Sequence, residues 1–144
     1  MDYILSIKKY TTFVKYFIQV KNRFFIRNIL INSIIKGILE KKGHEVVCID
    51  LSQVENAICD YFVICHGDSN TQVNAIAESI EKETAEHLKV RPGSVEGMGN
   101  AEWVLLDYGH TVVHVFQKPI RRRYQLEELW GDGNFTRIEE TNSQ

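Results

Sequence analysis

The stretch from Trp103 to Phe116 constrains the fold more than any other part of the sequence. Within it, two runs rich in β-branched and aromatic residues flank a glycine, a pattern typical of a β-hairpin. If Gly109 and His110 form a two-residue loop, Gly109 takes the first loop position, where a type II′ turn needs a positive φ. The pairs across the hairpin are then Tyr108 with Thr111, Leu106 with Val113, Val104 with Val115, Trp103 with Phe116, Leu105 with His114 and Asp107 with Val112. We expect this hairpin to be the centre of a sheet.

The two faces of the hairpin differ in chemistry. One face is aliphatic apart from Tyr108 and Thr111 near the turn, and we expect it to lie in the core. The other face mixes aliphatic side chains with Trp103, Asp107 and His114. Other even loop lengths keep these faces, because side chains alternate with a period of two, whereas a three-residue loop changes the pairing. The mixed face is either one partly covered side of a central hairpin or a surface that receives a partner.

The charge of the chain is unevenly distributed. Residues 1–27 hold six basic residues and one acidic residue, whereas the other 117 residues hold eleven basic and eighteen acidic residues, a net charge of −7. Phosphate repels so acidic a body, so we expect no DNA binding and a basic protein surface as the partner. Residues 1–27 have no apolar run long enough for a membrane span or a signal peptide. We expect a dispensable extension there, with a membrane-surface segment, an extra helix and an upstream start codon as alternatives.

A total of 144 residues predicts one domain with a sizeable core. Hydrophobic periodicity predicts helices at Asn28–Lys42, from the Ser69 cap to Leu88 and at Tyr124–Trp130, and strands at Glu45–Leu51, Asp60–Cys65 and Ser94–Met98 beside the hairpin. The domain then spans residues 28–132, and residues 133–144 form a polar, mobile tail. This order of elements predicts a single-domain α/β fold, with helices packed on a mixed sheet of about five strands.

The helix after Ser69 carries two further predictions. Ser69 and Gln72 match a capping box, in which Ser69 accepts from the third helical amide and Gln72 reaches back to the cap. We expect the helix to bury Val73, Ile76, Ala77, Ile80 and Leu88, and to expose an acidic face of Glu78, Glu81, Glu83 and Glu86.

No catalytic set emerges from the sequence. Metal-dependent nucleotidyl transfer needs two or three converging carboxylates, but no Asp-x-Asp or Asp-x-Glu pair lies on a predicted strand, and Asp107 stands alone. His114 lies inside a strand, which is more typical of a structural histidine than of a base. Cys59 and Cys65 have no second pair of zinc ligands, and with Cys48 they are expected to be reduced thiols of a cytoplasmic protein. We predict no enzyme, cofactor or metal.

Two sequence features leave alternatives open. A Gly-x-Ser loop at residues 67–69 opens a helix, so a nucleotide-binding or nucleotidyl-transferring enzyme using Gly67 and Ser69 is the alternative function. The run Arg121–Arg123 beside Tyr124 follows Pro119, and it is either a solvated turn or a surface that stacks on RNA bases or binds a protein.

Several segments resemble the ribosomal silencing factor family, which is also called the RsfS or Iojap family. They are residues 50–52, 60–65, 95–97, 103–109 and 113–116, Ser69 with 72–73 and 75–77, Arg121, and the pattern Tyr124-x-Leu126-Glu127-x-Leu129-Trp130-Gly131-Asp132. The resemblance covers about residues 29–132 and implies a nucleotidyltransferase-like topology without the catalytic carboxylates. His110 departs from the family, which usually has an acidic residue there.

The resemblance also implies a function. Members of this family are translational repressors that bind the large ribosomal subunit at universal ribosomal protein fourteen, block subunit joining and lower translation under nutrient limitation. A role in ribosome biogenesis and homodimerisation of the free protein are further expectations. The expected partner-binding residues are Trp103, Leu105, Asp107, His114, Arg121, Tyr124, Leu126, Leu129 and Trp130. Structural roles are expected for Ser69, Gln72, Gly97 and Gly109.

Overall fold

A mixed sheet of six strands forms the centre of the computed structural model, which describes residues 28–139. The strands are β1 (His44–Asp50), β2 (Tyr61–Gly67), β3 (Ser94–Glu96), β4 (Trp103–Asp107), β5 (Thr111–Gln117) and β6 (Asn134–Arg137), in the spatial order β3-β4-β5-β2-β1-β6. The helices are α3 (Ile29–Glu40), α4 (Asn70–Leu88), α5 (Lys118–Tyr124) and α6 (Leu126–Leu129). Only the β2–β5 pair is parallel among the described strands. The predicted α/β fold with a mixed sheet is confirmed, with one strand more than expected.

The central hairpin of β4 and β5 has the predicted register throughout. Gly109 has a φ of +94°, as its place in the two-residue loop requires. The Tyr108 amide donates to the Thr111 carbonyl at 2.9 Å and closes the loop. The prediction from Trp103 to Phe116 is therefore correct in both turn and pairing.

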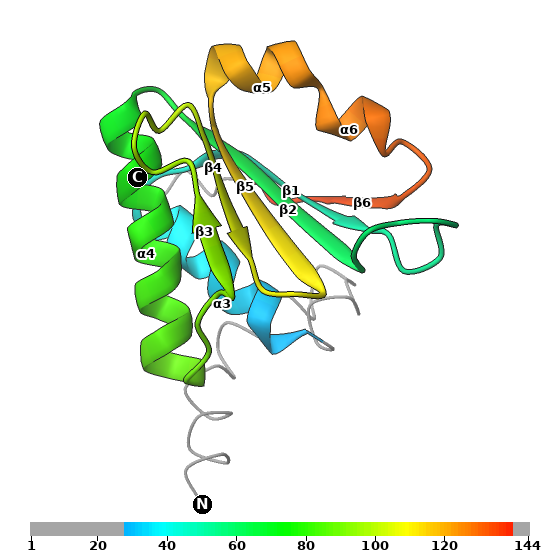
Figure 1. Cartoon of the computed structure of the whole chain (residues 1–144), viewed down its shortest axis with the longest axis horizontal. Coiled ribbons are helices and arrows are strands. Elements are labelled where there is room, and N and C mark those ends of the chain that lie inside the picture. The colour runs from blue at the N-terminus through cyan, green and yellow to red at the C-terminus, as the bar shows by residue number, and fades with distance from the viewer. Residues whose placement is uncertain (1–27, 140–144) are drawn as a thin grey trace, which may run out of the picture.

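Two cores lie on opposite faces of the sheet. Figure 1 shows the sheet between the α3–α4 pair and the α5–α6 segment. The first core joins α3 and α4 to the aliphatic face of the hairpin, as predicted. The second core lies under α5, α6 and the connection between β1 and β2. Its buried members are Val47, Ile49, Leu51, Phe62, Ile64, Val112 and Phe116.

The α3–α4 pair packs closely, because glycine lets two backbones approach. A Cβ on Gly37 of α3 would lie 2.8 Å from the Ile80 Cα of α4, and the Ser79 hydroxyl donates to the Gly37 carbonyl at 2.8 Å. At the start of α3, the Asn28 side chain accepts from the Ile31 amide at 3.2 Å. The helix predicted at Asn28–Lys42 thus begins after an asparagine cap and ends at Glu40.

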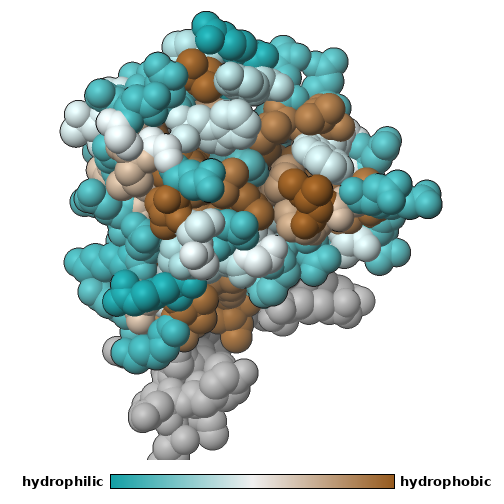
Figure 2. All heavy atoms as spheres, viewed as in Figure 1, coloured by the Kyte–Doolittle hydropathy of each residue, from teal (hydrophilic) through white to brown (hydrophobic). Residues whose placement is uncertain are grey.

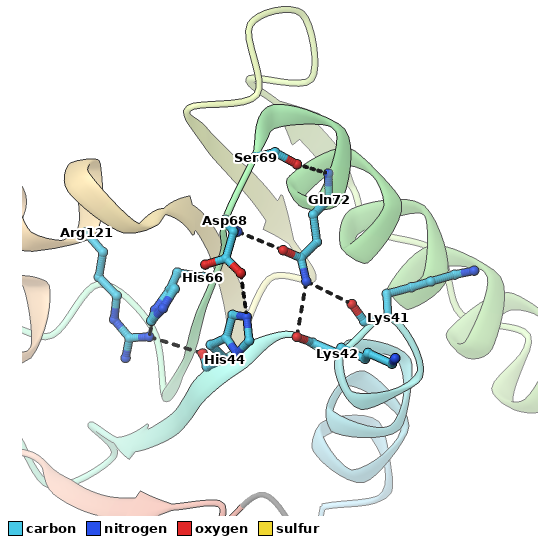
Figure 3. A network of polar contacts seen from close by, with 8 residues as sticks. All are labelled: Lys41, Lys42, His44, His66, Asp68, Ser69, Gln72 and Arg121. Carbon is cyan, nitrogen blue, oxygen red and sulfur yellow. Dashed lines mark hydrogen bonds and ion pairs between the residues drawn. The ribbon is translucent and has the colours of Figure 1, made fainter.

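The capping prediction for α4 is half correct. The Ser69 hydroxyl accepts from the Gln72 amide at 3.1 Å, as expected. However, the Gln72 carbonyl oxygen accepts from the Asp68 amide at 2.7 Å, not from the cap residue, and its NH₂ donates to the carbonyls of Lys41 and Lys42 (Figure 3). Gln72 therefore ties the start of α4 to the end of α3.

The predicted acidic face of α4 includes one wrong residue. Glu83 is buried, because it lies against α3, where its carboxylate is 3.5 Å from the Lys36 ammonium. Its carboxylate also lies 3.2 Å from His87, one turn further along α4. Burial raises the pKa of Glu83 above its usual value. Glu78 and Glu86 are exposed, as expected.

After Phe116 the structure excludes one alternative and shows that two predictions are wrong. Residues 118–124 form helix α5, with Pro119 in its first turn, which excludes the alternative of a solvated arginine turn. The single helix predicted at Tyr124–Trp130 is broken, because Gln125 has a φ of +48° and separates α5 from α6. Residues 134–137, expected in a mobile tail, form β6 and pair with β1 at the sheet edge.

Candidate protein-binding face

The mixed face of the hairpin carries a cluster of stacked rings. The Trp103 ring lies 4.9 Å from the Phe116 ring on β5 and 4.9 Å from the Tyr124 ring at the end of α5. Phe116 is fully buried, Trp103 is half-buried and Tyr124 is 51% exposed. Trp103 therefore connects the core to an aromatic side chain at the surface.

His114 lies directly behind this cluster. Its Nδ1 accepts from the Trp103 indole N–H at 3.1 Å, and its ring is edge-on to Phe62 at 4.6 Å. Only 4% of His114 is exposed, and burial lowers its pKa from 6.5 to about 4. The neutral ring carries its proton on Nε2, which finds no partner among residues 28–139. His114, an expected binding residue, is placed to orient Trp103 from below the surface.

Two large apolar side chains in segments next to the second core are strongly exposed. Leu129 of α6 is 71% exposed and Ile58, between β1 and β2, is 76% exposed. The residues next to them pack on the second core: Leu126 and Trp130 lie near Leu129, and Cys59 follows Ile58. Figure 2 shows apolar patches over the middle of the view, where Figure 1 places the strands, with polar side chains around them. We call Trp103, Leu105, Tyr124, Leu129 and Ile58 the apolar face.

Ile58 was not predicted as a site residue. The available signal was an isoleucine inside the connection between two predicted strands. Single exposed apolar residues are common on protein surfaces, so this signal alone is weak.

Arg121 is placed differently from its neighbours on α5. It is only 8% exposed, and its guanidinium donates to the Glu127 carboxylate at 2.9 and 2.6 Å. It also donates to the His66 Nδ1 at 2.9 Å and to the His44 carbonyl at 3.4 Å (Figure 3). Burial first, and the Arg121 charge second, lower the pKa of His66. Arg121 was expected to bind a partner, but its donors are used to hold α5 and α6 onto β1 and β2.

The other expected binding residues divide into packed and exposed groups. Leu126 and Trp130 point toward the second core, with the Trp130 ring edge-on to Phe62 at 5.8 Å. Leu129, on the same short helix as Leu126, is instead strongly exposed. Asp107 accepts from the Gly109 amide at 2.8 Å, which gives its carboxylate a role in shaping the turn.

Gly97 allows β3 and β4 to lie close together. It has a φ of +90°, and a Cβ there would collide with the Trp103 carbonyl oxygen. Only glycine lets β3 approach β4 so closely at the start of the strand that carries Trp103.

In the loop at residues 67–69, the Asp68 backbone amide is not free to bind a phosphate. The Asp68 amide is taken by Gln72, and the Asp68 carboxylate lies 3.0 Å from the His44 Nε2. Asp68 of this loop lines a cavity of about 390 Å³, and a second cavity of about 270 Å³ lies beside α5; acidic and basic side chains line both. Within residues 28–139, no group of three or more His, Cys, Asp or Glu side chains could hold a metal ion. This geometry does not favour the nucleotide-binding alternative.

A model of the family described as ribosomal silencing factor during starvation matches residues 26–144. The chain belongs to the ribosomal silencing factor family. The match confirms the family resemblance, and it extends beyond residue 132, where the domain was expected to end. The family consists of ribosome-associated regulators of translation.

Individual proteins of the family show the same likeness. The ribosomal silencing factor RsfS of Bacillus subtilis is 43% identical over 93 residues, which cover 65% of this chain and 77% of that protein. The mouse protein named mitochondrial assembly of ribosomal large subunit protein 1 is 30% identical over 97 residues, which cover 65% of this chain and 42% of that protein. A crystal structure of protein CV0518 from Chromobacterium violaceum, 33% identical, has a TM-score of 0.67 and covers 71% of this chain and 83% of that one.

No helix among residues 28–139 has the length and the apolar character that crossing a membrane requires.

Proposed function

We propose that this silencing factor represses translation by binding the large ribosomal subunit at universal ribosomal protein fourteen. Bound there, it blocks the small subunit sterically and lowers translation in the cytoplasm when nutrients are limited. The action is binding alone, without catalysis or a cofactor. The observation that carries the proposal is the apolar face, with three strongly exposed large side chains, in a member of this family.

The composition of the apolar face suits a protein partner. Tyr and Trp are enriched among the residues that dominate protein interfaces, and Tyr124 rests on a Trp103 that is itself held by His114. A side chain held in place before binding loses less conformational entropy on association. The face therefore favours a specific contact with a folded protein.

The charge of the body supports a basic protein as that partner. Outside residues 1–27 the chain holds eighteen acidic residues against eleven basic ones. Opposite net charges steer two proteins toward each other and raise the association rate. A basic ribosomal protein meets this requirement.

The large subunit is the better of the two subunit candidates. The name of the mouse relative refers to assembly of the ribosomal large subunit, and it aligns with this chain over 97 residues. We extend the proposal to a role in maturation of that subunit.

Sedimentation with purified ribosomal subunits tests the proposal. We expect the protein to travel with large subunits and not with small subunits, and to reduce the formation of whole ribosomes when both subunits are mixed. Protein that stays at the top of the gradient at low salt contradicts the proposal. Binding to large subunits without any effect on joining contradicts the steric mechanism alone.

A further inference from the structure

Helix α5 holds the densest group of basic side chains in the described part of the chain. Residues 118–130 contain four basic and two acidic residues, whereas the rest of residues 28–144 contains seven basic and sixteen acidic residues. One short segment of an otherwise acidic body is thus net positive. It adjoins the apolar face, because Arg123 precedes Tyr124 directly.

The four basic side chains of α5 fall into two groups. Arg121 points inward, where it is paired with Glu127 and contacts His66. Lys118, Arg122 and Arg123 are exposed, and within residues 28–139 their side chains form no hydrogen bond or ion pair. We call these three the basic edge. The basic edge is therefore exposed and, within the described part of the chain, not engaged in a polar contact of its own.

The cavity beside α5 is a poor site for a small anion. Lys118 and Arg122 line it, but so do Glu45 and Glu128, whose carboxylates offset their charge. With 3.6 residues per helical turn, Arg123 lies two residues beyond the buried Arg121 and faces away from the sheet. The charge of Arg123 therefore lies on the outside of the helix, next to the exposed Arg122, where an extended polyanion has access.

We infer that the basic edge binds the phosphate backbone of ribosomal RNA while the apolar face binds the ribosomal protein. The inference rests on the proposed function, because RNA is the polyanion next to any protein site on a ribosomal subunit. Guanidinium groups match phosphate oxygens with paired hydrogen bonds and carry no sequence preference in doing so. The acidic remainder of the body is repelled by the same RNA, so the two contacts together fix one orientation of the protein on the subunit.

The salt dependence of binding tests this inference. In R122Q/R123Q we expect binding to large subunits at low salt to weaken by about tenfold or more, and the slope of log affinity against log salt to fall by about one per arginine. The matched control K82Q/K89Q also removes two exposed positive charges, from α4 and its C-terminal cap residue, and we expect it to keep the wild-type slope. Circular dichroism confirms that both variants are folded.

A second titration identifies the partner of the arginines. With purified ribosomal protein fourteen in place of the subunit, R122Q/R123Q is expected to bind as the wild type does. An equal loss on the isolated protein overturns the inference, since the arginines then contact protein. An unchanged salt slope on subunits, or an equal change in K82Q/K89Q, overturns it as well while leaving the proposed function intact. Failure of the wild type to bind large subunits overturns both.

Discussion

The two faces of the sheet are covered in different ways. On one face, α3 and α4 have 12 and 19 residues, and their buried side chains form a continuous aliphatic core. On the other face, α5 and α6 have 7 and 4 residues, and several of the apolar side chains there are only partly buried. The first face is closed by close helix packing, and the second is covered by two short helices that leave part of the sheet accessible.

The α5–α6 segment is held on the sheet by polar contacts in addition to apolar packing. Arg121 connects α5 and α6 to the strands, and His114 positions Trp103. Hydrogen bonds are directional, so they fix the positions of a few surface side chains without burying them. Under the proposed function, the binding surface therefore lies on the side of the sheet opposite the α3–α4 core. Variants on the two sides should differ in their effects on the free energy of unfolding and on binding.

The largest effect is expected in the α3–α4 core. Ile80 is fully buried against α3, so Ile80→Ala leaves a cavity and is expected to cost about 2–5 kcal/mol of stability. Leu129→Ala, at an exposed position of α6, is expected to change stability by less than about 0.5 kcal/mol. Urea unfolding followed by circular dichroism measures both. Similar values for the two variants would contradict the division between the faces.

A smaller effect on stability is expected at the polar contacts that hold α5 and α6 on the sheet. Arg121→Met leaves the Glu127 carboxylate partly buried without its partner, so we expect a loss of about 2–3 kcal/mol. Arg122→Met on the same helix serves as the control and should change stability by less than about 0.5 kcal/mol. If a double-mutant cycle with Glu127→Gln shows no coupling energy, Arg121 does not hold α6 in place.

Acid is expected to weaken the second face through His114. Burial lowers its folded-state pKa from 6.5 to about 4, so an unfolded chain takes up the proton more readily. The stability due to neutral His114 is complete above pH 6.5 and is lost as the pH falls toward 4, by about 2 kcal/mol between pH 7.5 and pH 5. Urea titrations at these two pH values, on wild type and His114→Gln, measure the difference. Equal pH dependence in both proteins would exclude His114 as its source.

The smallest effect on stability, but a large one on binding, is expected at the exposed end of α6. Leu129→Ser removes an apolar side chain that is already in water, so unfolding should change by less than about 0.5 kcal/mol. Binding to large subunits is expected to weaken tenfold or more if Leu129 is an anchor of the interface. Val90→Ser, at an exposed apolar position after α4, is the matched control. Wild-type affinity of Leu129→Ser would remove Leu129 from the interface.

The sequence predicts the hairpin well because its signals are local. Alternation with a period of two and a glycine with positive φ determine the register of β4 and β5 without reference to the rest of the chain. The helices α3 and α4 follow from periodicity and from the caps at Asn28 and Ser69. The family follows from motifs that occur together over most of the chain.

The sequence predictions are wrong where contacts between residues far apart in the chain determine the structure. Residues 134–137 are polar on average, and they form a strand because the open edge of β1 offers backbone partners. Arg121 has the same composition signal as Arg122, and only the positions of His66 and Glu127 separate their roles. Gln125 ends α5 with a left-handed backbone conformation, which a glutamine in the sequence does not indicate.

The position of the aromatic residues has a spectroscopic consequence. The chain contains two tryptophans, Trp103 and Trp130, and both pack on the second core. Intrinsic tryptophan fluorescence therefore observes only the α5–α6 side of the sheet and not the α3–α4 side. An emission change on adding large subunits would report a contact at the apolar face without any label. A fluorescence transition that precedes the one seen by circular dichroism would show that the α5–α6 side opens before the domain unfolds.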